Sequence, residues 1–185
     1  TRVRASLDDV NTPSAFTGNI DVLAEDTSAI HSLVDAPSIA VAASADKATG
    51  VSVGLSVSRN ELTNVMEAYI ANAPSPISTS GNVPVRSDER ATIDATSTAS
   101  SIVVALSLEK STAFSGGGAT AVNLIKGKGN AYISSADISA TGSGALEVAA
   151  TNDSEITALV KAIAVAAGGG LSGNTPAVAI GFSLA

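Results

Sequence analysis

One stretch of this sequence occurs three times at a fixed interval. The segment NAYISSADIS at Asn130 is similar to EAYIANAPSP at Glu67 and to RASLDDVNTP at Arg4, and successive copies begin 63 residues apart. Self-similarity at a fixed period is typical of repeat architectures, in which neighbouring units bury a core that one unit cannot bury alone. We therefore divide the 185 residues into repeats at 1–63, 64–126 and an incomplete 127–185. We expect one continuous solenoid that is part of a longer array.

The 63-residue interval extends beyond that stretch and needs no insertion. GNIDV at Gly18 aligns with GNVPV at Gly81 and with GALEV at Gly144. Further matches are Ile30 with Ile93 and Ile156, Ile39 with Ile102 and Val165, Asn60 with Asn123, and Tyr69 with Tyr132. Stacking places such residues next to one another, so we expect ladders of like side chains.

The local pattern within each repeat predicts an all-β fold. Segments such as NAYIS and AVAIGFSLA alternate in the way that is typical of strands, and Gly, Asn, Asp, Ser and Pro separate them. The run SEITALVKAIAVAAGGG could form a helix, but its counterpart in the first repeat contains Pro37, which would break one. We therefore expect strands in all three repeats.

The spacing of these strands predicts their arrangement. GALEV, SEITAL and AIAVAA give three short strands with tight corners in roughly 22 residues, which suits one coil of a three-sided parallel β-helix. The rest of the repeat would form a second coil, so we expect a repetitive parallel β-helix, or β-solenoid, with about two coils per repeat. The alternative is a stack of antiparallel β-hairpins, in which VSVGLSVSRNELTNVMEAYI turns between Asn60 and Asn64.

Charge and composition argue against several classes of partner. The net charge is −7, whereas nucleic-acid binding needs a basic surface. The most apolar run, ALVKAIAVAAGGGL, contains Lys161 and is shorter than a membrane-spanning helix. We therefore expect neither nucleic-acid binding nor membrane insertion. The sequence contains no cysteine, which excludes disulfides and thiolate metal sites.

The sequence offers no set of residues suited to catalysis. His31 is the one histidine, and its equivalents in the other repeats are Asp94 and Thr157, so it supplies neither a Ser-His-Asp triad nor a typical zinc site. GGGLSG, residues 168–173, matches the dinucleotide-binding glycine pattern, but a strand-like segment follows it where a helix is required. We expect a protein that is not an enzyme and has no cofactor.

Acidic and amide residues recur at one corner of the repeat. The set comprises Glu25, Asp26, Asp88, Glu89, Asn152 and Asp153. Oxygen-rich turns suit calcium, yet the sequence contains neither the EF-hand spacing nor the glycine–aspartate nonapeptide of calcium-binding β-rolls. We expect a solvated turn here, and the six residues are the candidate ligands if the protein binds calcium.

The repeats resemble known sequence tracts. The segments NAYISSADISATGSGALEVAA, EAYIANAPSPISTSGNVPVRS, VSVGLSVSRNELTNV and GGGATAVNLIKG carry the resemblance. They are similar to the repeat tracts of large surface proteins of Gram-negative bacteria, the filamentous-haemagglutinin-like and repeat-rich adhesins. The resemblance implies secretion, a location outside the cell or on its surface, a long rod, and a role in adhesion or matrix building.

Two functions are compatible with these observations. The first is a structural repeat module of an extracellular fibre or cell-surface rod, which acts by end-to-end stacking and self-association, with other copies of the repeat or protein as partners. The alternative is a receptor- or glycan-binding module of a bacterial adhesin, whose partner is a host or cell-surface glycan or protein. Binding would then reside in an unusual loop, for which residues 74–90 are the candidate.

Overall fold

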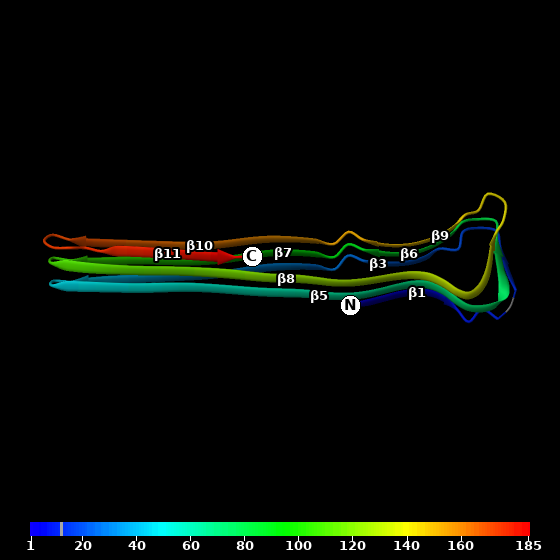
Figure 1. Cartoon of the computed structure of the whole chain (residues 1–185), viewed down its shortest axis with the longest axis horizontal. Coiled ribbons are helices and arrows are strands. Elements are labelled where there is room, and N and C mark those ends of the chain that lie inside the picture. The colour runs from blue at the N-terminus through cyan, green and yellow to red at the C-terminus, as the bar shows by residue number, and fades with distance from the viewer. Residues whose placement is uncertain (12) are drawn as a thin grey trace. The chain divides into compact units, whose positions relative to one another are not determined.

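The computed structural model describes residues 1–11 and 13–185, and every helix or strand that it forms there is a β-strand. The strands are β1 (Arg2–Asp8), β2 (Ser14–Phe16), β3 (Val22–Asp26), β4 (Ala29–Ser44), β5 (Lys47–Thr79), β6 (Val83–Glu89), β7 (Thr92–Ser107), β8 (Lys110–Ala140), β9 (Leu146–Asn152), β10 (Glu155–Gly170) and β11 (Ala177–Leu184) (Figure 1). The described residues accordingly include no helix with the length and apolar character to cross a membrane. The all-β prediction is confirmed.

The strands form three sheets by parallel pairing. Their orders are β1-β5-β8-β11, with β2 also on β5, then β10-β7-β4, and β3-β6-β9. Arg2 pairs with Val65, Val22 pairs with Val85, and the side chains of Asn60 and Asn123 are hydrogen-bonded across 63 residues. Each repeat therefore adds one layer to the stack, and the predicted parallel stacking is confirmed.

The prediction of about two coils per repeat is wrong, and so is the antiparallel alternative. Two coils would pair strands about half a repeat apart, but the observed partners are one whole repeat apart. The reason is strand length, because β5 has 33 residues and β8 has 31. The segment expected to turn between Asn60 and Asn64 lies wholly inside β5, and Asn60 Nδ2 there donates to Asn123 Oδ1 at 2.7 Å.

The chain folds into two compact units, each of which takes about half of every repeat. The first unit comprises residues 1–29, 61–92 and 124–156. The second unit comprises residues 30–60, 93–123 and 157–185. They differ in what they bury, and each is described by itself below.

The first unit has an apolar core between two sheets. The largest apolar side chains that β3, β5 and β6 bury there are Val22, Met66, Ile70, Ile77, Val83 and Val85. The chain bends at Asp9, Asn72 and Ser135, which occupy equivalent positions in the three repeats and have φ of 60°, 52° and 50°. Asp and Asn are among the non-glycine residues that adopt this left-handed conformation most readily. The recurring bend thus positions each layer in the same way.

The predicted tyrosine ladder is confirmed in this unit. The rings of Tyr69 and Tyr132 are stacked with centroids 5.0 Å apart and an interplanar angle of 5°. The Arg4 guanidinium carbon lies 5.8 Å from the Tyr69 centroid on the neighbouring layer. Stacking of this kind favours the in-register arrangement of like residues.

The second unit buries small side chains between the sheet of β4, β7 and β10 and the sheet of β5, β8 and β11. A zigzag of serine hydroxyls crosses from one sheet to the other. Ser52 Oγ donates to Ser38 Oγ at 2.8 Å, Ser101 Oγ donates to Ser52 Oγ at 2.9 Å, and Ser115 Oγ donates to Ser101 Oγ at 2.9 Å. Only short side chains allow two sheets to approach closely enough for these bonds.

The third repeat leaves the 63-residue interval in its second half. Ala177 pairs with Ala113, a separation of 64 residues, so the preceding turn holds one extra residue and the expectation of no insertion is wrong there. Since side chains alternate along a strand, a shift of one residue exchanges the two faces. Gly181 consequently faces the opposite sheet, where an added Cβ would lie 3.1 Å from the Ala162 carbonyl oxygen. Ile180 and Phe182 then face outward.

Candidate functional site

The six calcium candidates lie at the ends of β3, β6 and β9, but they divide between the two faces of that sheet. Glu25 pairs with Asp88, and Asp26 pairs with Glu89 in the adjacent position. Neighbouring residues of a strand point to opposite faces, so Glu25 and Asp88 are outside while Asp26 and Glu89 are buried. Asn152 continues the inner row, since it pairs with Glu89.

The outer carboxylates contact side chains of adjacent layers. Glu25 Oε1 lies 2.7 Å from Arg90 Nη1, and Asp88 Oδ1 accepts a hydrogen bond from Thr151 Oγ1 at 2.7 Å. Asp153 is exposed, and its backbone N–H donates to the carbonyl oxygen of Glu89. These groups therefore join one layer to the next.

The inner row is a polar cluster at the edge of the first unit's core. Glu89 is fully buried, and its carboxylate accepts hydrogen bonds from Asn152 Nδ2 at 2.9 Å and from Asn64 Nδ2 at 3.4 Å. Asp26 Oδ1 accepts from the backbone N–H of Ser28 at 3.2 Å and from its hydroxyl at 2.6 Å. Gly127 gives the Glu89 carboxylate its space, because an added Cβ would overlap it.

The structure thus brings Asp26, Glu89 and Asn152 together and keeps Glu25 and Asp88 on the other face. Among residues 1–11 and 13–185, no group of three or more His, Cys, Asp or Glu side chains is close enough to hold a metal ion. Calcium binding at this corner stays a prediction. Asn64 is the member that sequence reasoning missed, because it lies on a different strand and no local pattern links it to Glu89.

Exposed ion pairs connect successive layers of the first unit. Arg2 Nη2 and Arg4 Nη2 lie 3.0 Å and 2.8 Å from Glu67 Oε2, and Lys126 lies beside Glu61. Hydrogen bonds from Arg4 and then Arg2 hold the pKa of Glu67 below its ordinary value near 4.5. Single exposed pairs contribute little free energy, but opposite charges placed across strands favour one register over others.

Acidic pH should weaken the contact at Glu67. Because its pKa is lower in the folded state than in the unfolded state, the carboxylate stabilises the fold above pH 4.5, and this contribution disappears as the pH falls through the folded value. The difference in unfolding free energy between the wild type and Glu67→Gln should be constant near neutral pH and shrink at lower pH. Urea titrations from pH 7 to pH 3 measure it.

The arginines provide the control for that experiment. In a background of Arg2→Ala and Arg4→Ala, the same Glu67→Gln comparison should lose most of its pH dependence, because the donors that lower the pKa of Glu67 are gone. A difference that is equally large at pH 7 and pH 3 in the wild type would contradict the assignment.

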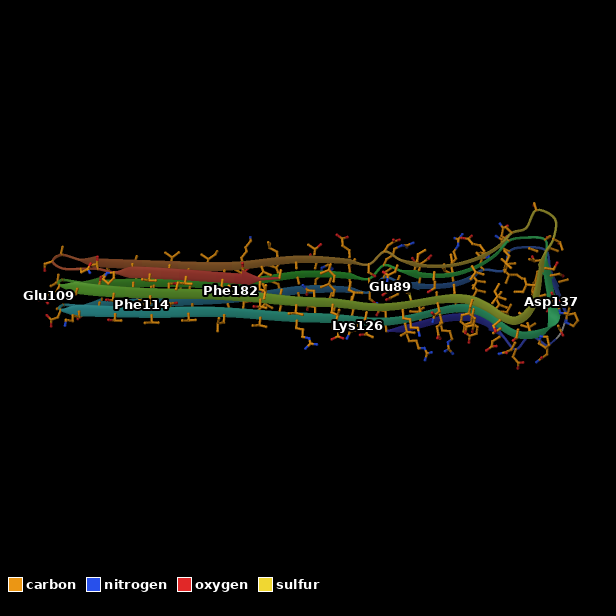
Figure 2. All side chains as sticks on the ribbon, in the orientation of Figure 1. Glu89, Glu109, Phe114, Lys126, Asp137 and Phe182 are labelled. Atoms are coloured by element: carbon orange, nitrogen blue, oxygen red, sulfur yellow. The ribbon has the colours of Figure 1, made fainter. Side chains whose placement is uncertain are left out.

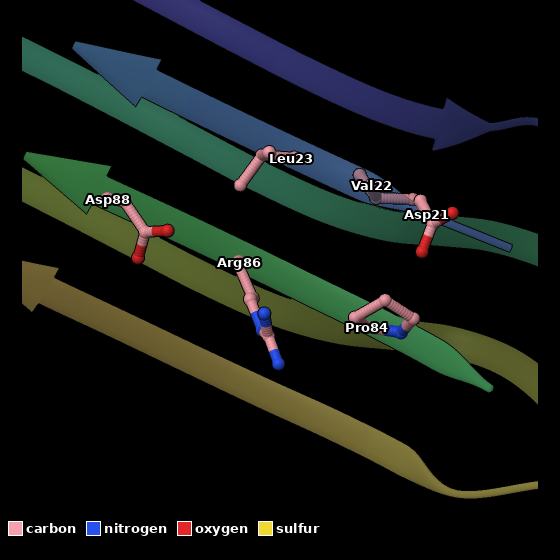
Figure 3. A pocket seen from close by; sticks show the side chains of 6 residues that line it. All are labelled: Asp21, Val22, Leu23, Pro84, Arg86 and Asp88. Atoms are coloured by element: carbon pink, nitrogen blue, oxygen red, sulfur yellow. The ribbon is translucent and has the colours of Figure 1, made fainter.

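A shallow hollow lies on the outer face of β3 and β6. Figure 3 shows the side chains that line it, and the lining residues are Asp21, Val22, Leu23, Pro84, Arg86 and Asp88. Arg86 Nε donates to Glu147 Oε1 at 3.2 Å, and this hydrogen bond raises the pKa of the arginine. Arg86 and Asp88 are therefore engaged with the next layer, which makes the hollow part of the ladder of charges.

The other sequence candidates lie in ordinary strand and turn positions. His31 Nδ1 is 3.8 Å from Asp94 Oδ2 on the adjacent layer, and both side chains are exposed. Of residues 168–173, the first three end β10 and the others form the turn before β11. Residues 74–90 are the end of β5, a short turn and β6, in register with their neighbours, so they do not form a separate loop.

The sheet edges present rows of backbone hydrogen-bonding groups. The Thr1 carbonyl accepts a hydrogen bond from Val65 N–H at 2.9 Å, so Thr1 faces β5. Backbone N–H and C=O groups alternate in direction along a strand. Arg2, Arg4 and Ser6 of β1 therefore direct their N–H and C=O groups away from the sheet. At the opposite edge the Pro176 carbonyl accepts a hydrogen bond from Ala113 N–H at 3.0 Å, so Pro176 faces β8. Ala177 and every second residue after it in β11 therefore direct their backbone N–H and C=O groups outward. Within the described chain, β1 and β11 end this sheet.

Comparisons with protein-family models, curated proteins and solved structures found no match to this chain.

Proposed function

We propose that the chain is a non-enzymatic structural module of an extracellular fibre or cell-surface rod, built as a β-solenoid whose layers stack end to end on further copies of the repeat. The observation that carries the proposal is the parallel register of one repeat per layer. A constant register can be extended by any copy that presents the same pattern of strands, as in other solenoids. The resemblance to surface-protein repeats supports the location.

The edges offer an incoming copy backbone partners of the kind that join the layers of one chain. Open parallel edges act as templates for further strands. Asn19 Oδ1 accepts from the N–H of Asn82, and Asn82 Oδ1 accepts from the N–H of Ala145, each at 2.9 Å. The same hydrogen bond, from a backbone N–H to an asparagine side chain, thus joins the first layer to the second and the second to the third. The third layer has Ala145 at this position, so a further copy would be joined to it by backbone hydrogen bonds alone.

We favour this function over receptor or glycan binding. The alternative needs a loop or cleft that differs from its equivalents, and the sequence offers residues 74–90 for it. These residues run as strand, turn and strand beside residues one repeat away. Arg86, the cation of the outer hollow, is engaged by Glu147.

The proposal is tested with a variant that blocks one edge. Ala179→Pro removes an outward N–H of β11 without removing a hydrogen bond inside the sheet, whereas Ala179→Ser keeps the N–H and a small side chain. Negative-stain microscopy of the wild type and Ala179→Ser should show filaments, with a rise of about 14 Å for each three-layer copy. Ala179→Pro should remain folded by circular dichroism and form few filaments.

Two results would overturn the proposal. One is wild-type protein that stays monomeric by light scattering at every concentration, and in that case a glycan array becomes the next experiment. The other is an Ala179→Pro variant that forms as many filaments as Ala179→Ser. Antibody labelling of intact source cells tests the surface location separately.

A further inference from the structure

The second unit carries large apolar side chains on its outer surface. On the sheet of β5, β8 and β11 the outward residues include Val51, Val53, Leu55, Val57, Phe114, Val122, Val178, Ile180, Phe182 and Leu184. Leu55 is 71% exposed and Ile180 is 66% exposed. Figure 2 labels Phe114 and Phe182 on this part of the molecule. The interior of the same unit holds mostly serine, alanine and glycine, with Ile93 and Val103 as buried larger residues, so most of its large apolar side chains lie outside.

This surface, which we call the β5-β8-β11 face, is uncharged. No Lys, Arg, Asp or Glu occurs within residues 48–58, 111–125 or 177–185. The outer face of the opposite sheet differs, because Asp35, Asp94 and Lys161 are exposed on it. Contiguous apolar surface without charge marks an interaction site, because charges are what natural sheets place on surfaces that should stay free.

The face has a groove between two ridges. Gly116 and Gly118 form its floor on β8, while Val53 and Leu55 on β5 and Ile180 and Phe182 on β11 form the walls. An added Cβ on Gly116 would be 3.9 Å from Val53 Cγ2, whereas one on Gly118 would be 2.9 Å from Leu55 Cδ2. The groove and each ridge are therefore one strand wide.

We propose that the β5-β8-β11 face binds the same face of a second copy of this chain, with a ridge of each copy in the groove of the other. A surface that carries both a groove and a ridge of matching width is self-complementary, as a two-fold contact requires. A second copy also repeats its side chains at the same strand spacing, so the match continues through every stacked layer. This inference rests on the proposed stacking function and adds a lateral contact to it.

The area of the face explains why lateral contact would depend on stacking. Three strands about 4.8 Å apart and roughly 30 Å of strand length give about 400 Å² per chain. A stable interface buries about 800 Å² on each partner. One chain would therefore pair weakly, whereas stacked copies present the face many times over and pair firmly. Filaments should associate side by side, and single chains should dimerise only at high concentration.

The test separates lateral from end-to-end contact. In the Ala179→Pro background, which blocks the edge, sedimentation equilibrium at high concentration should detect a weak dimer. Leu55→Lys should weaken that dimer more than about tenfold, because a lysine ammonium would be buried without a partner. The matched control is Leu23→Lys, the same substitution at an outward apolar residue of the first unit, and it should leave the dimer unchanged. In wild-type filaments, Leu55→Lys should convert bundles into single filaments.

Three results would overturn the inference. One is the absence of any dimer in the Ala179→Pro background, even if wild-type filaments form. Another is a dimer that Leu55→Lys does not weaken. Flotation with phosphatidylcholine vesicles tests a lipid occupant. Vesicle binding that Leu55→Lys abolishes, without self-association, would assign the face to lipid. A separate result distinguishes the two proposals. If the wild type forms no filaments but the weak dimer is still detected, the stacking function is refuted and the lateral contact is retained.

Discussion

Gly54→Ala should destabilise the second unit by about 2 to 3 kcal/mol, which is a large effect for one methyl group. Gly54 lies between the two sheets, where an added Cβ would be 2.6 Å from the Ser100 carbonyl oxygen and 2.9 Å from that of Ala36. Both are backbone atoms of strands held by neighbours on the sheet, so neither can move away without loss of hydrogen bonds. Urea unfolding followed by circular dichroism measures the change.

Gly116→Ala is the matched control for this result. It lies on β8 in the same unit but faces outward, where the nearest atom to an added Cβ is Val53 Cγ2 at 3.9 Å. Alanine should be neutral or slightly stabilising there, because glycine in a strand costs backbone entropy. Equal losses at the two glycines would mean that the close approach of the sheets does not limit the size of Gly54.

Glu89→Ala should cost the first unit about 2 to 4 kcal/mol. The change removes the acceptor for the amides of Asn64 and Asn152 and opens a cavity. Asn64 is buried, so its amide is left without a partner away from water, whereas Asn152 is exposed and can bond to water. Thermal and urea unfolding should both show the loss. The effect should be much larger than that of any single ion pair on the surface.

Glu25→Ala tests whether burial, rather than negative charge at this corner, makes the difference. Glu25 is exposed and pairs with Arg90 at 2.7 Å, and such pairs contribute about 0 to 1 kcal/mol. We expect its loss to lie in that range. If Glu25→Ala and Glu89→Ala were equally costly, the division of the acidic residues between two faces would be wrong as an explanation.

The repeat made the parallel stacking predictable, because like residues one repeat apart can meet only if successive layers are in register. Tyr69 with Tyr132 and Asn60 with Asn123 are pairs that could be assigned from the sequence alone. The number of layers per repeat could not. Asn60 and Asn64 look like turn residues by type, but in β5 Asn60 bonds to Asn123 of the neighbouring layer and Asn64 bonds to Glu89 of another sheet. Local propensity carries no information about either partner.

The acidic corner shows a second limit. The sequence predicts a solvated turn that contains both Glu25 and Asp26, yet both belong to β3, and adjacent residues of a strand face opposite ways. A corner read without its strand end therefore merges an outer ladder, Glu25 and Asp88, with an inner cluster, Asp26 and Glu89. The change from 63 to 64 residues before β11 was hidden for the same reason, since alternating small and apolar residues fit either register.

The strands β5 and β8 pass from one layer to the next without a turn, and this has a mechanical consequence. Consider tension that draws the two ends of the chain apart along the stacking direction. It breaks the hydrogen bonds of an edge layer one after another, as in peeling. It does not load all of these bonds together, as shear would. Each layer released would add about 210 Å of extended chain. A fibre of such layers would lengthen in large, even steps while the layers still stacked kept their structure, and so would absorb load before breaking.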